Sequence, residues 1–340
     1  MNIIVTGGCG FVGSSICLYL KKEIKNLNII SVDNLSKIYS NYNQRKLKKK
    51  YIINKKINMG SIDNFKNLKF KADFIIDCSA EPSVEASKKN ISKVIQSNLL
   101  STFNVLEKAK KDGSKVIFLS SSRVYPIKLS YDKFSIYLKN KRHRFYNENE
   151  SVLGAKTIYG FTKYSSEELI KEYMYSEKVE YIINRCGLIS GPGQFGKVEQ
   201  GLVSLWMWKH INKSKLSFIG HNGSGKQIRD VLFVEDLCAL ILKQIINFKK
   251  FRNNIFCVGG GKKNIIDLKK LTYLCEKISG NKVKISNIKK TSNYDIPYYV
   301  SSLKKIIKVS NWKPRKNLKN GLQEIYKWMI NDKSKIKDFF

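Results

Sequence analysis

Short apolar runs rich in β-branched residues alternate with longer stretches of helical periodicity through the first 185 residues. The runs predict strands, and the stretches between them predict helices. Strands that alternate with helices are typical of an α/β fold, in which a parallel sheet is covered on both faces. We expect strands at 2–6, 28–32, 51–57, 73–77, 115–120 and 180–185, and long helices at 87–111 and 157–178.

Beyond residue 190 the predicted elements become shorter and turn signals become denser, as at Gly191-Pro-Gly193. We therefore expect a first domain over 1–185 and a smaller α/β domain over 186–340, with some segments of the second returning to the first. The stretch 126–156 is an unusually long connection, basic and aromatic in composition, and is a candidate functional loop.

Three glycines follow the first predicted strand at intervals of three: Gly7, Gly10 and Gly13. An apolar helical stretch comes next. Backbone N–H groups at a helix N-terminus, with no side chains in the way, can accept a pyrophosphate. Strand, glycine loop and helix in this order predict a Rossmann-type, doubly wound parallel sheet that binds a dinucleotide.

The second predicted strand ends at Asp33, about 20 residues past the glycines. A carboxylate there can hold both ribose hydroxyls of a dinucleotide and repel a 2′-phosphate. The sequence therefore predicts NAD rather than NADP as the cofactor. Lys37 lies close by and could weaken this preference.

The net charge of +36 raises the question of a nucleic-acid partner. The lysine excess, however, runs through the whole chain and decorates otherwise ordinary helices. Solvated helix faces explain it, so we expect no nucleic-acid partner. A positive surface would still attract an anionic nucleotide substrate.

The seven cysteines show no Cys-x-x-Cys spacing, and the three histidines are dispersed. We expect neither a disulfide framework nor a metal site, and a reducing cytoplasm fits this pattern. No apolar run approaches the length of a membrane span, and the first strand begins at residue 2. We expect no membrane association and no signal or transit segment.

Tyr159 and Lys163 lie four residues apart at the start of a long predicted helix, so they share one face. A nearby ammonium favours the phenolate of a tyrosine, and a phenolate can accept the proton of a sugar hydroxyl while hydride leaves the carbon. The same spacing recurs at Tyr42, Tyr51, Tyr137 and Tyr273. Order along the chain distinguishes Tyr159: it follows the glycine loop and then a strand that ends in serines.

The segment Gly220-His-Asn-Gly-Ser-Gly225-Lys226 matches most of a phosphate-binding P-loop. Gln227 stands where a Ser or Thr would contact magnesium, and the residues that follow are predicted to be extended rather than helical. We interpret this segment as a turn and not as an NTPase site.

These motifs together resemble the extended short-chain dehydrogenase/reductase family, the nucleotide-sugar epimerases and dehydratases, over nearly the whole length. Further matching pieces are Asp77-Cys-Ser-Ala-Glu-Pro-Ser-Val84, Asn98 with Thr102, Asn104-Val-Leu-Glu107, Arg229-Asp230 with Asp236, and Asn311-Trp-Lys-Pro314. Within the family the chain looks most like the CDP-paratose (CDP-tyvelose) 2-epimerase group, on Asn184-Arg-Cys-Gly187, 191–201 and 223–230.

The resemblance implies a catalytic set of Ser121, Tyr159 and Lys163. It implies NAD contacts from Gly7, Gly10, Phe11, Val12, Gly13, Asp33, Asn34, Ser61, Ile62, Ser79, Ala80, Asn98, Tyr159 and Lys163. It implies substrate contacts from Glu81, Ser122, Arg123, Gln194, Lys197, Gln200 and Arg229. Relatives pair two long helices from each subunit, which implies a homodimer.

Family members that eliminate water or carbon dioxide carry an acidic residue just after the catalytic Ser or Thr. This chain has Ser122 and Arg123 there, which favours epimerisation. The chain also departs from the family pattern: Ser61 replaces an aspartate that reaches the adenine, Ser101 replaces a common glycine, and no arginine follows Asp295 to hold the second phosphate.

The expected function is NAD-dependent epimerisation of a nucleotide-diphosphate sugar, with a CDP-sugar and its C2 carbon favoured by the group resemblance. A 4-epimerase would use the same residues at C4. A net dehydrogenase or reductase that releases its cofactor stays open. A non-catalytic NAD-sensing or RNA-binding protein is the remaining alternative from another functional class.

Overall fold

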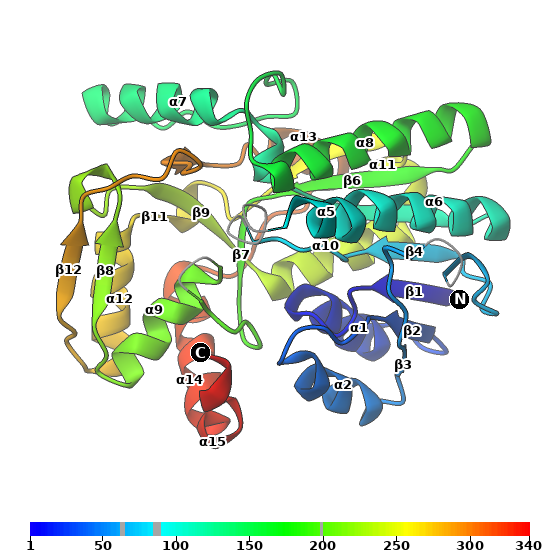
Figure 1. Cartoon of the computed structure of the whole chain (residues 1–340), viewed down its shortest axis with the longest axis horizontal. Helices are drawn as coiled ribbons and strands as arrows, with labels where there is room; N and C mark the ends of the chain where they lie inside the picture. Colours follow the sequence, from blue (N-terminus) through cyan, green and yellow to red (C-terminus); the bar gives the residue numbers. More distant parts are fainter. Residues whose placement is uncertain (62–64, 84–89, 198–199) are drawn as a thin grey trace. The chain divides into compact units, whose positions relative to one another are not determined.

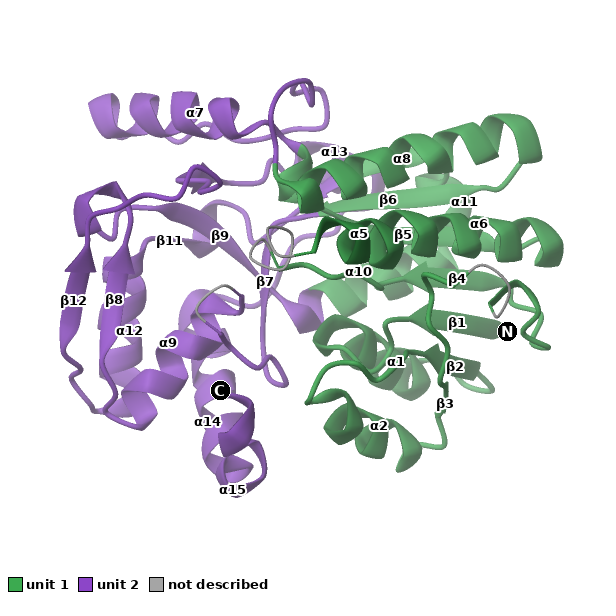
Figure 2. Cartoon of the chain, in the orientation of Figure 1, with its two compact units in different colours: residues 1–124, 157–185, 237–256 green, residues 125–156, 186–236, 257–340 purple. Residues whose placement is uncertain are grey.

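The computed structural model describes residues 1–61, 65–83, 90–197 and 200–340. Contacts within the chain divide it into two compact units, which Figure 2 colours separately. The first unit comprises Met1–Val124, Thr157–Arg185 and Leu237–Phe256. The second comprises Tyr125–Lys156, Cys186–Asp236 and Cys257–Phe340.

The first unit is built on a seven-stranded sheet with the order β10-β6-β5-β4-β1-β2-β3. The pairings β1–β2, β1–β4, β2–β3 and β4–β5 are all parallel. This order places a switch in winding direction between β1 and β4, as in doubly wound dinucleotide-binding sheets, and confirms the predicted fold class. The strands are β1 Asn2–Thr6, β2 Asn28–Val32, β3 Ile53–Lys55, β4 Phe74–Asp77, β5 Lys115–Ser121, β6 Tyr181–Cys186 and β10 Asn254–Val258.

Helices cover this sheet, and Figure 1 shows α6 and α8 running side by side along the strands. The helical elements are α1 Phe11–Glu23, α2 Ser40–Lys48, α5 Ile91–Ile95, the π-helical η1 Gln96–Leu100, α6 Ser101–Asp112, the 3₁₀ turn η2 Ser122–Val124, α8 Ile158–Glu177, α10 Val234–Ile246 and α11 Phe248–Phe251. The helix expected at 157–178 is confirmed as α8. The helix expected at 87–111 corresponds to α5, η1 and α6, with its first residues outside the described ranges.

A buried apolar cluster explains why strands of this sheet are continuous hydrophobic runs in the sequence. It joins residues of β1, β2, β4, β5 and β6 to the inner sides of α6 and α8, so these strands are buried by the layer packed on them. Its fully buried members include Ile4, Val32, Ile75, Val105, Leu106, Val116, Phe118, Ile170 and Ile183.

The second unit contains a small sheet in which β9 pairs with β7, β11 and β13, and a separate parallel pair of β8 and β12. Its strands are β7 Leu188–Ser190, β8 Leu216–Ile219, β9 Ile228–Phe233, β11 Ile265–Ile266, β12 Ile285–Ile288 and β13 Tyr298–Tyr299. Its helices are α7 Ile127–Asn140, α9 Leu202–Ile211, α12 Leu268–Ser279, α13 Lys304–Ser310, α14 Leu318–Asn331 and α15 Lys333–Ile336. Short 3₁₀ turns are η3 His221–Gly223, η4 Lys262–Asn264 and η5 Lys337–Phe339.

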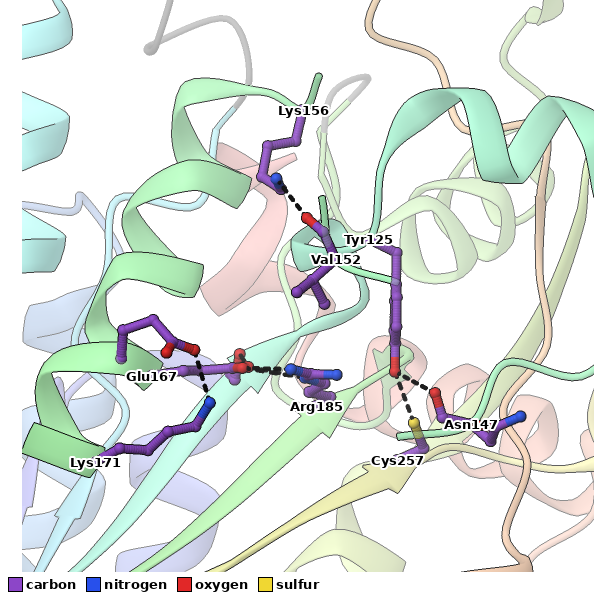
Figure 3. Close-up of polar contacts among 10 residues, drawn as sticks. Tyr125, Asn147, Val152, Lys156, Glu167, Lys171, Arg185 and Cys257 are labelled. Carbon is purple, nitrogen blue, oxygen red and sulfur yellow. Dashed lines mark hydrogen bonds and ion pairs between the residues drawn. The ribbon is translucent and has the colours of Figure 1, made fainter. Parts of the chain in front are cut away.

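The stretch 126–156 contains a regular helix, α7, where the sequence suggested only a long connection. The helix was missed because its buried residues, Ser130, Lys133 and Phe134, are mostly polar and give no apolar stripe. Ser130 bonds the backbone of Tyr298 in both directions, donating at 2.8 Å and accepting at 3.0 Å. The hydroxyl of Tyr125, before the helix, donates to the carbonyl of Asn147, after it, and so connects the two ends of the segment (Figure 3).

The P-loop-like segment is a turn, as expected. Its 3₁₀ turn η3 leads into the strand β9 and not into a helix.

Asp230 lies on β9 with its side chain fully buried. Its carboxylate accepts from the backbone N–H of Gly261 at 2.9 Å and from the hydroxyl of Ser301 at 3.5 Å. Burial raises the pKa of Asp230 to about 6, and these donors offset only part of the effect.

The raised pKa of Asp230 predicts a stability that falls as pH rises. The pKa of Asp230 is higher in the folded than in the unfolded protein, so its protonation favours the folded state. This contribution to the free energy of unfolding is complete below the unfolded pKa and is lost as pH rises through the folded pKa, a change of at most about 3 kcal/mol. Relative to Asp230→Asn, the wild type should lose unfolding free energy between about pH 4 and 7. Urea unfolding at several pH values measures this, with Asp132→Asn on the exposed face of α7 as the control. A difference that does not change with pH would contradict the prediction.

Candidate active site

The turn from β1 into α1 is tight enough to require glycine at two positions. Gly7 has φ +60°, and a Cβ there would lie 2.9 Å from the carbonyl oxygen of Cys78. A Cβ on Gly13 would lie 2.3 Å from the carbonyl oxygen of Gly7. Gly10 is the N-cap residue of α1, and no side-chain hydrogen bond caps the N-terminus of this helix. This geometry fits a bound pyrophosphate. The predicted contacts Phe11 and Val12 are half-buried in the first turn of α1.

Asp33 follows β2 and touches the glycine loop directly. Its carboxylate accepts from the backbone N–H of Cys9 at 3.0 Å and from that of Leu35 at 2.8 Å. Burial raises the pKa of Asp33, and these backbone donors oppose the rise. The side chain is therefore held beside the glycine loop, where the sequence predicts a contact with the ribose hydroxyls. Asn34, the next predicted contact, is exposed.

The loop after β4 is held by hydrogen bonds to the end of that strand and to the start of α6. The hydroxyl of Ser79 donates to Asp77 at 2.7 Å and lies 2.6 Å from the hydroxyl of Ser101. Ser101, which replaces a common glycine of the family, thus holds a predicted NAD contact. Ala80 is the half-buried residue that follows Ser79.

Asn98 lies in the π-helical segment η1 and links this loop to α8. Its side-chain oxygen accepts from the backbone N–H of Glu81 at 2.7 Å, and its amide nitrogen donates to the hydroxyl of Thr162 at 2.9 Å. The carbonyl of Ser61 accepts from Asn104 at 3.1 Å. The predicted contact at Ile62 lies outside the described residues.

Glu81 is buried and forms an ion pair with Lys37, at 2.6 Å between Nζ and Oε2. The loop after β4 is thereby joined to the loop after β2, and β1 with its glycine loop lies between those two strands. This pairing opposes the idea that Lys37 weakens the NAD preference, since its ammonium is directed to a carboxylate and not left for a 2′-phosphate.

The structure places Ser121, Tyr159 and Lys163 on packed elements of the first unit. Ser121 ends β5, and Tyr159 and Lys163 lie in the first two turns of α8, which packs on β5 and on η2. Lys163 is buried, and its ammonium lies 4.3 Å from the ring centroid of Phe118 on β5. The serine, tyrosine and lysine thus come from the carboxyl end of one strand and the start of the helix against it.

The start of α8 is fixed closely against η2. Thr157 caps the helix, its hydroxyl accepting from the backbone N–H of Gly160 at 3.0 Å. A Cβ on Gly160 would lie 2.1 Å from the carbonyl oxygen of Arg123, so only glycine permits this approach next to Tyr159. Ser122 and Arg123, predicted substrate contacts, are half-buried in η2, where the N–H of Arg123 donates to Ser121 Oγ at 3.1 Å.

The remaining predicted substrate residues lie in the second unit. Gln194 is engaged within its own loop, because its side chain bonds Ser190, Ser204 and the carbonyl of Ile189. Lys197 and Gln200 are exposed and pair through their backbones, with N–H to carbonyl distances of 2.6 and 3.1 Å.

Arg229 lies on β9, the strand that also pairs with β7 before the loop of Gln194. Its guanidinium donates to the carbonyls of Ile228 and Ile296. Burial lowers the pKa of Arg229, and the nearby Asp295 opposes this. Asp295 itself pairs with His221 at 3.0 Å. His221 therefore pairs with the residue after which the family's arginine for the second phosphate is missing.

Sequence reasoning missed a buried charged group next to the predicted catalytic set. Glu167 on α8 accepts from Arg185 on β6 and from Ser120 on β5, and Figure 3 shows Glu167 and Arg185 directed toward one another. One signal could have identified it: apart from Glu180 at its start, Arg185 is the charged residue of the predicted strand at 180–185.

Within the described ranges, no group of three or more His, Cys, Asp or Glu side chains is arranged to hold a metal ion. The described helices include none that is both long and apolar enough to cross a membrane.

The geometry defines the class of protein: a doubly wound, dinucleotide-binding type of sheet with a serine at the end of β5 and a tyrosine and a lysine at the start of α8. The model of the "NAD dependent epimerase/dehydratase family" matches residues 3–259, so the chain belongs to that family. It is an NAD-dependent enzyme of the nucleotide-sugar epimerase and dehydratase class, which confirms the predicted family, enzyme class and cofactor.

Two curated relatives match along nearly the full length of both chains. A CDP-paratose 2-epimerase of Salmonella typhi is 26% identical over 96% of this chain and 99% of its own. A putative UDP-glucose 4-epimerase of Methanocaldococcus jannaschii is 30% identical over 97% of this chain and 99% of its own. A solved UDP-glucuronic acid 4-epimerase of Bacillus cereus, in complex with UDP-glucuronic acid and NAD, is 21% identical with a TM-score of 0.83, over 97% and 99% of the two chains.

The placement of Asp33 predicts that NAD binds at least about tenfold more tightly than NADP. Asp33→Ala should narrow this ratio, because the carboxylate that repels a 2′-phosphate is gone. The ratio is the informative quantity, since the glycine loop also loses the contact at Cys9 and both affinities should fall. Calorimetry on cofactor-stripped protein measures it. The control is Glu180→Ala. This carboxylate lies at the start of β6, whereas Asp33 lies at the end of β2. Equal affinities of the wild type for both cofactors would contradict the prediction.

Proposed function

We propose that this enzyme epimerises a nucleotide-diphosphate sugar by transient oxidation and re-reduction of one ring carbon. The observation that carries the proposal is the placement of Ser121, Tyr159 and Lys163 on β5 and α8, in the same unit as the glycine loop. The carboxyl ends of parallel strands are where such sheets bind and transform their ligands.

Each of the three residues has a defined role in the proposed mechanism. Bound NAD supplies the acceptor for the hydride and later its donor. Tyr159 takes the hydroxyl proton as the carbon–hydrogen bond breaks, and it returns that proton when the keto group is reduced. Lys163 favours the phenolate of Tyr159 and holds the nicotinamide ribose, and Ser121 orients the reacting hydroxyl.

Epimerisation is preferred over elimination of water because of the residues after Ser121. Elimination needs an acid to protonate the leaving hydroxyl, and Ser122 and Arg123 in η2 offer no carboxylic acid. Oxidation and return of the hydride to the other face of the ring need only the base already present. Between the two steps the keto sugar must turn or shift within the site.

A CDP-sugar epimerised at C2 is the favoured substrate, supported by the likeness to the Salmonella typhi enzyme. The comparably similar putative UDP-glucose 4-epimerase supports a second candidate, a UDP-sugar epimerised at C4. In either case we assign Arg229 to the diphosphate, and Glu81, Ser122, Arg123, Gln194, Lys197 and Gln200 to the remaining substrate contacts. Incubation with CDP-, UDP-, GDP- and dTDP-sugars, followed by NMR for a new epimer, distinguishes the candidates. Stoichiometric NADH in place of an epimer would indicate a net dehydrogenase.

We also propose that the protein is a homodimer located in the cytoplasm. Helices α6 and α8 lie side by side, and Phe161 and Tyr175 are exposed on α8, fourteen residues apart and hence near one face. A second copy could bury such a face in an isologous contact. None of the seven cysteines, which all lie in the described ranges, forms a disulfide in the structure, as expected in a reducing compartment.

Tyr159→Phe removes the acid–base group but keeps the ring, so folding and NAD content should stay unchanged. Turnover should fall by roughly 10²–10⁴-fold, the usual contribution of a general acid–base group. A substrate deuterated at the epimerised carbon should retain its deuterium in the wild-type product, because the hydride never leaves the enzyme. Tyr137→Phe is the matched control: it has the same spacing to a lysine, but on α7. Deuterium lost to solvent would rule out the oxidation–reduction route.

The dimer predicts a solution mass of about twice the chain mass of 39.2 kDa. Light scattering over a wide concentration range measures it. Phe161→Glu together with Tyr175→Glu should shift the protein toward the monomer, since four charges in an isologous contact repel. A wild-type mass near 39.2 kDa at every concentration would contradict the prediction.

A further inference from the structure

Three side chains from three elements of the first unit meet at one buried carboxylate. Arg185 on β6 donates to Glu167 on α8, from Nε at 3.1 Å to both carboxylate oxygens and from Nη2 at 2.7 Å. Ser120 on β5 donates its hydroxyl to the same carboxylate. The side chains of Glu167 and Arg185 are 0% and 4% exposed. We call these three residues the buried clamp.

The buried clamp is a costly way to hold two strands and a helix together. Removing a carboxylate and a guanidinium from water costs several kcal/mol per ion, and apolar side chains of similar size often stabilise a core as well or better. The best-attested use of such pairs is to fix one register among several. The position of the clamp indicates that the relevant register is that of α8 on β5.

Two members of the clamp, Glu167 and Ser120, lie near proposed catalytic residues on their own elements. Glu167 follows Lys163 by four residues and Tyr159 by eight, so all three lie on one side of α8. Ser120 directly precedes Ser121 at the end of β5. The clamp therefore connects the helix that carries the proposed base to the strand that carries the proposed serine, one helical turn beyond Lys163 and about two turns beyond Tyr159.

We propose that Glu167, Arg185 and Ser120 are positioning residues: they fix the axial register of α8 on β5 and thereby set the distance from Tyr159 and Lys163 to Ser121. The proposal rests on the roles assigned above to those three catalytic residues. A carboxylate bonded on two sides holds its helix against sliding more strictly than apolar contacts, which tolerate small shifts. Misplacement of reacting groups by about 1 Å can cost about 10²-fold in rate.

The decisive variant is Glu167→Gln combined with Arg185→Met, which removes both charges and leaves neither ion unpaired. Its urea unfolding midpoint and its NAD content should match the wild type, because the core stays filled and the desolvated charges are gone. Its kcat should still fall by roughly 10- to 100-fold with little change in KM. The isotope effect on kcat for substrate deuterated at the reacting carbon should rise, because hydride transfer becomes the slow step.

A matched pair elsewhere in the same unit provides the control. Lys108 and Asp112 form another buried ion pair, at 2.8 Å within α6, and belong to neither β5 nor α8. Lys108→Met with Asp112→Asn should therefore leave kcat unchanged. A double variant at Glu167 and Arg185 that has both wild-type kcat and wild-type stability would overturn the proposal.

Ser120→Ala decides the question if the double variant does not fold. It removes only the bond from β5 to the clamp, and kcat should fall several-fold at unchanged KM and NAD content. Ser166→Ala is its control: Ser166 is buried on the same helix, and its hydroxyl has no hydrogen-bond partner among the described residues. Wild-type kcat in Ser120→Ala would overturn the proposal. Tyr159→Phe in the same assay separates the two ideas: an active Tyr159→Phe refutes the assigned chemistry, whereas an inactive one beside fully active clamp variants refutes only the clamp.

Discussion

The turn from β1 into α1 sets the geometry on which the rest of the first unit depends. Gly7 and Gly13 bring the turn so close to itself and to the loop after β4 that a Cβ at either position would collide with backbone. The same closeness lets the N–H of Cys9 reach Asp33 at the end of β2. One turn therefore fixes the helix N-terminus that suits a pyrophosphate and the carboxylate that suits a ribose.

Around that turn, polar contacts join the loops at the carboxyl ends of the strands. Asn98 connects the loop after β4 to α8, and the ion pair of Lys37 with Glu81 connects it to the loop after β2. Buried polar groups are expensive unless satisfied, and satisfied ones specify a single arrangement. Such contacts suit the proposed mechanism, which requires NAD and the reacting sugar to be held in one geometry through two hydride transfers.

The two units differ in how their candidate residues are held. In the first unit, Ser121 and Lys163 are buried on regular elements, which gives them fixed positions. In the second, Lys197 and Gln200 are exposed on a loop. This division agrees with the family's range of sugars, since a constant chemistry requires a rigid frame and a variable substrate is accommodated by loops.

The sequence alone determined the features that depend on local order: the strand and helix rhythm, the glycine loop, Asp33 and the start of α8. Each of these is encoded by neighbouring residues, so periodicity and spacing were enough. Helix α7 was missed because its buried residues are polar, and the hydrophobic pattern carries no record of contacts such as that between Ser130 and Tyr298. The tertiary structure alone decided that Glu167 meets Ser120 and Arg185, which lie 47 and 18 residues away along the chain. Which side chains meet Glu167 depends on how α8 packs on β5 and β6. That packing depends on all the side chains between the helix and the sheet, and local sequence does not specify it.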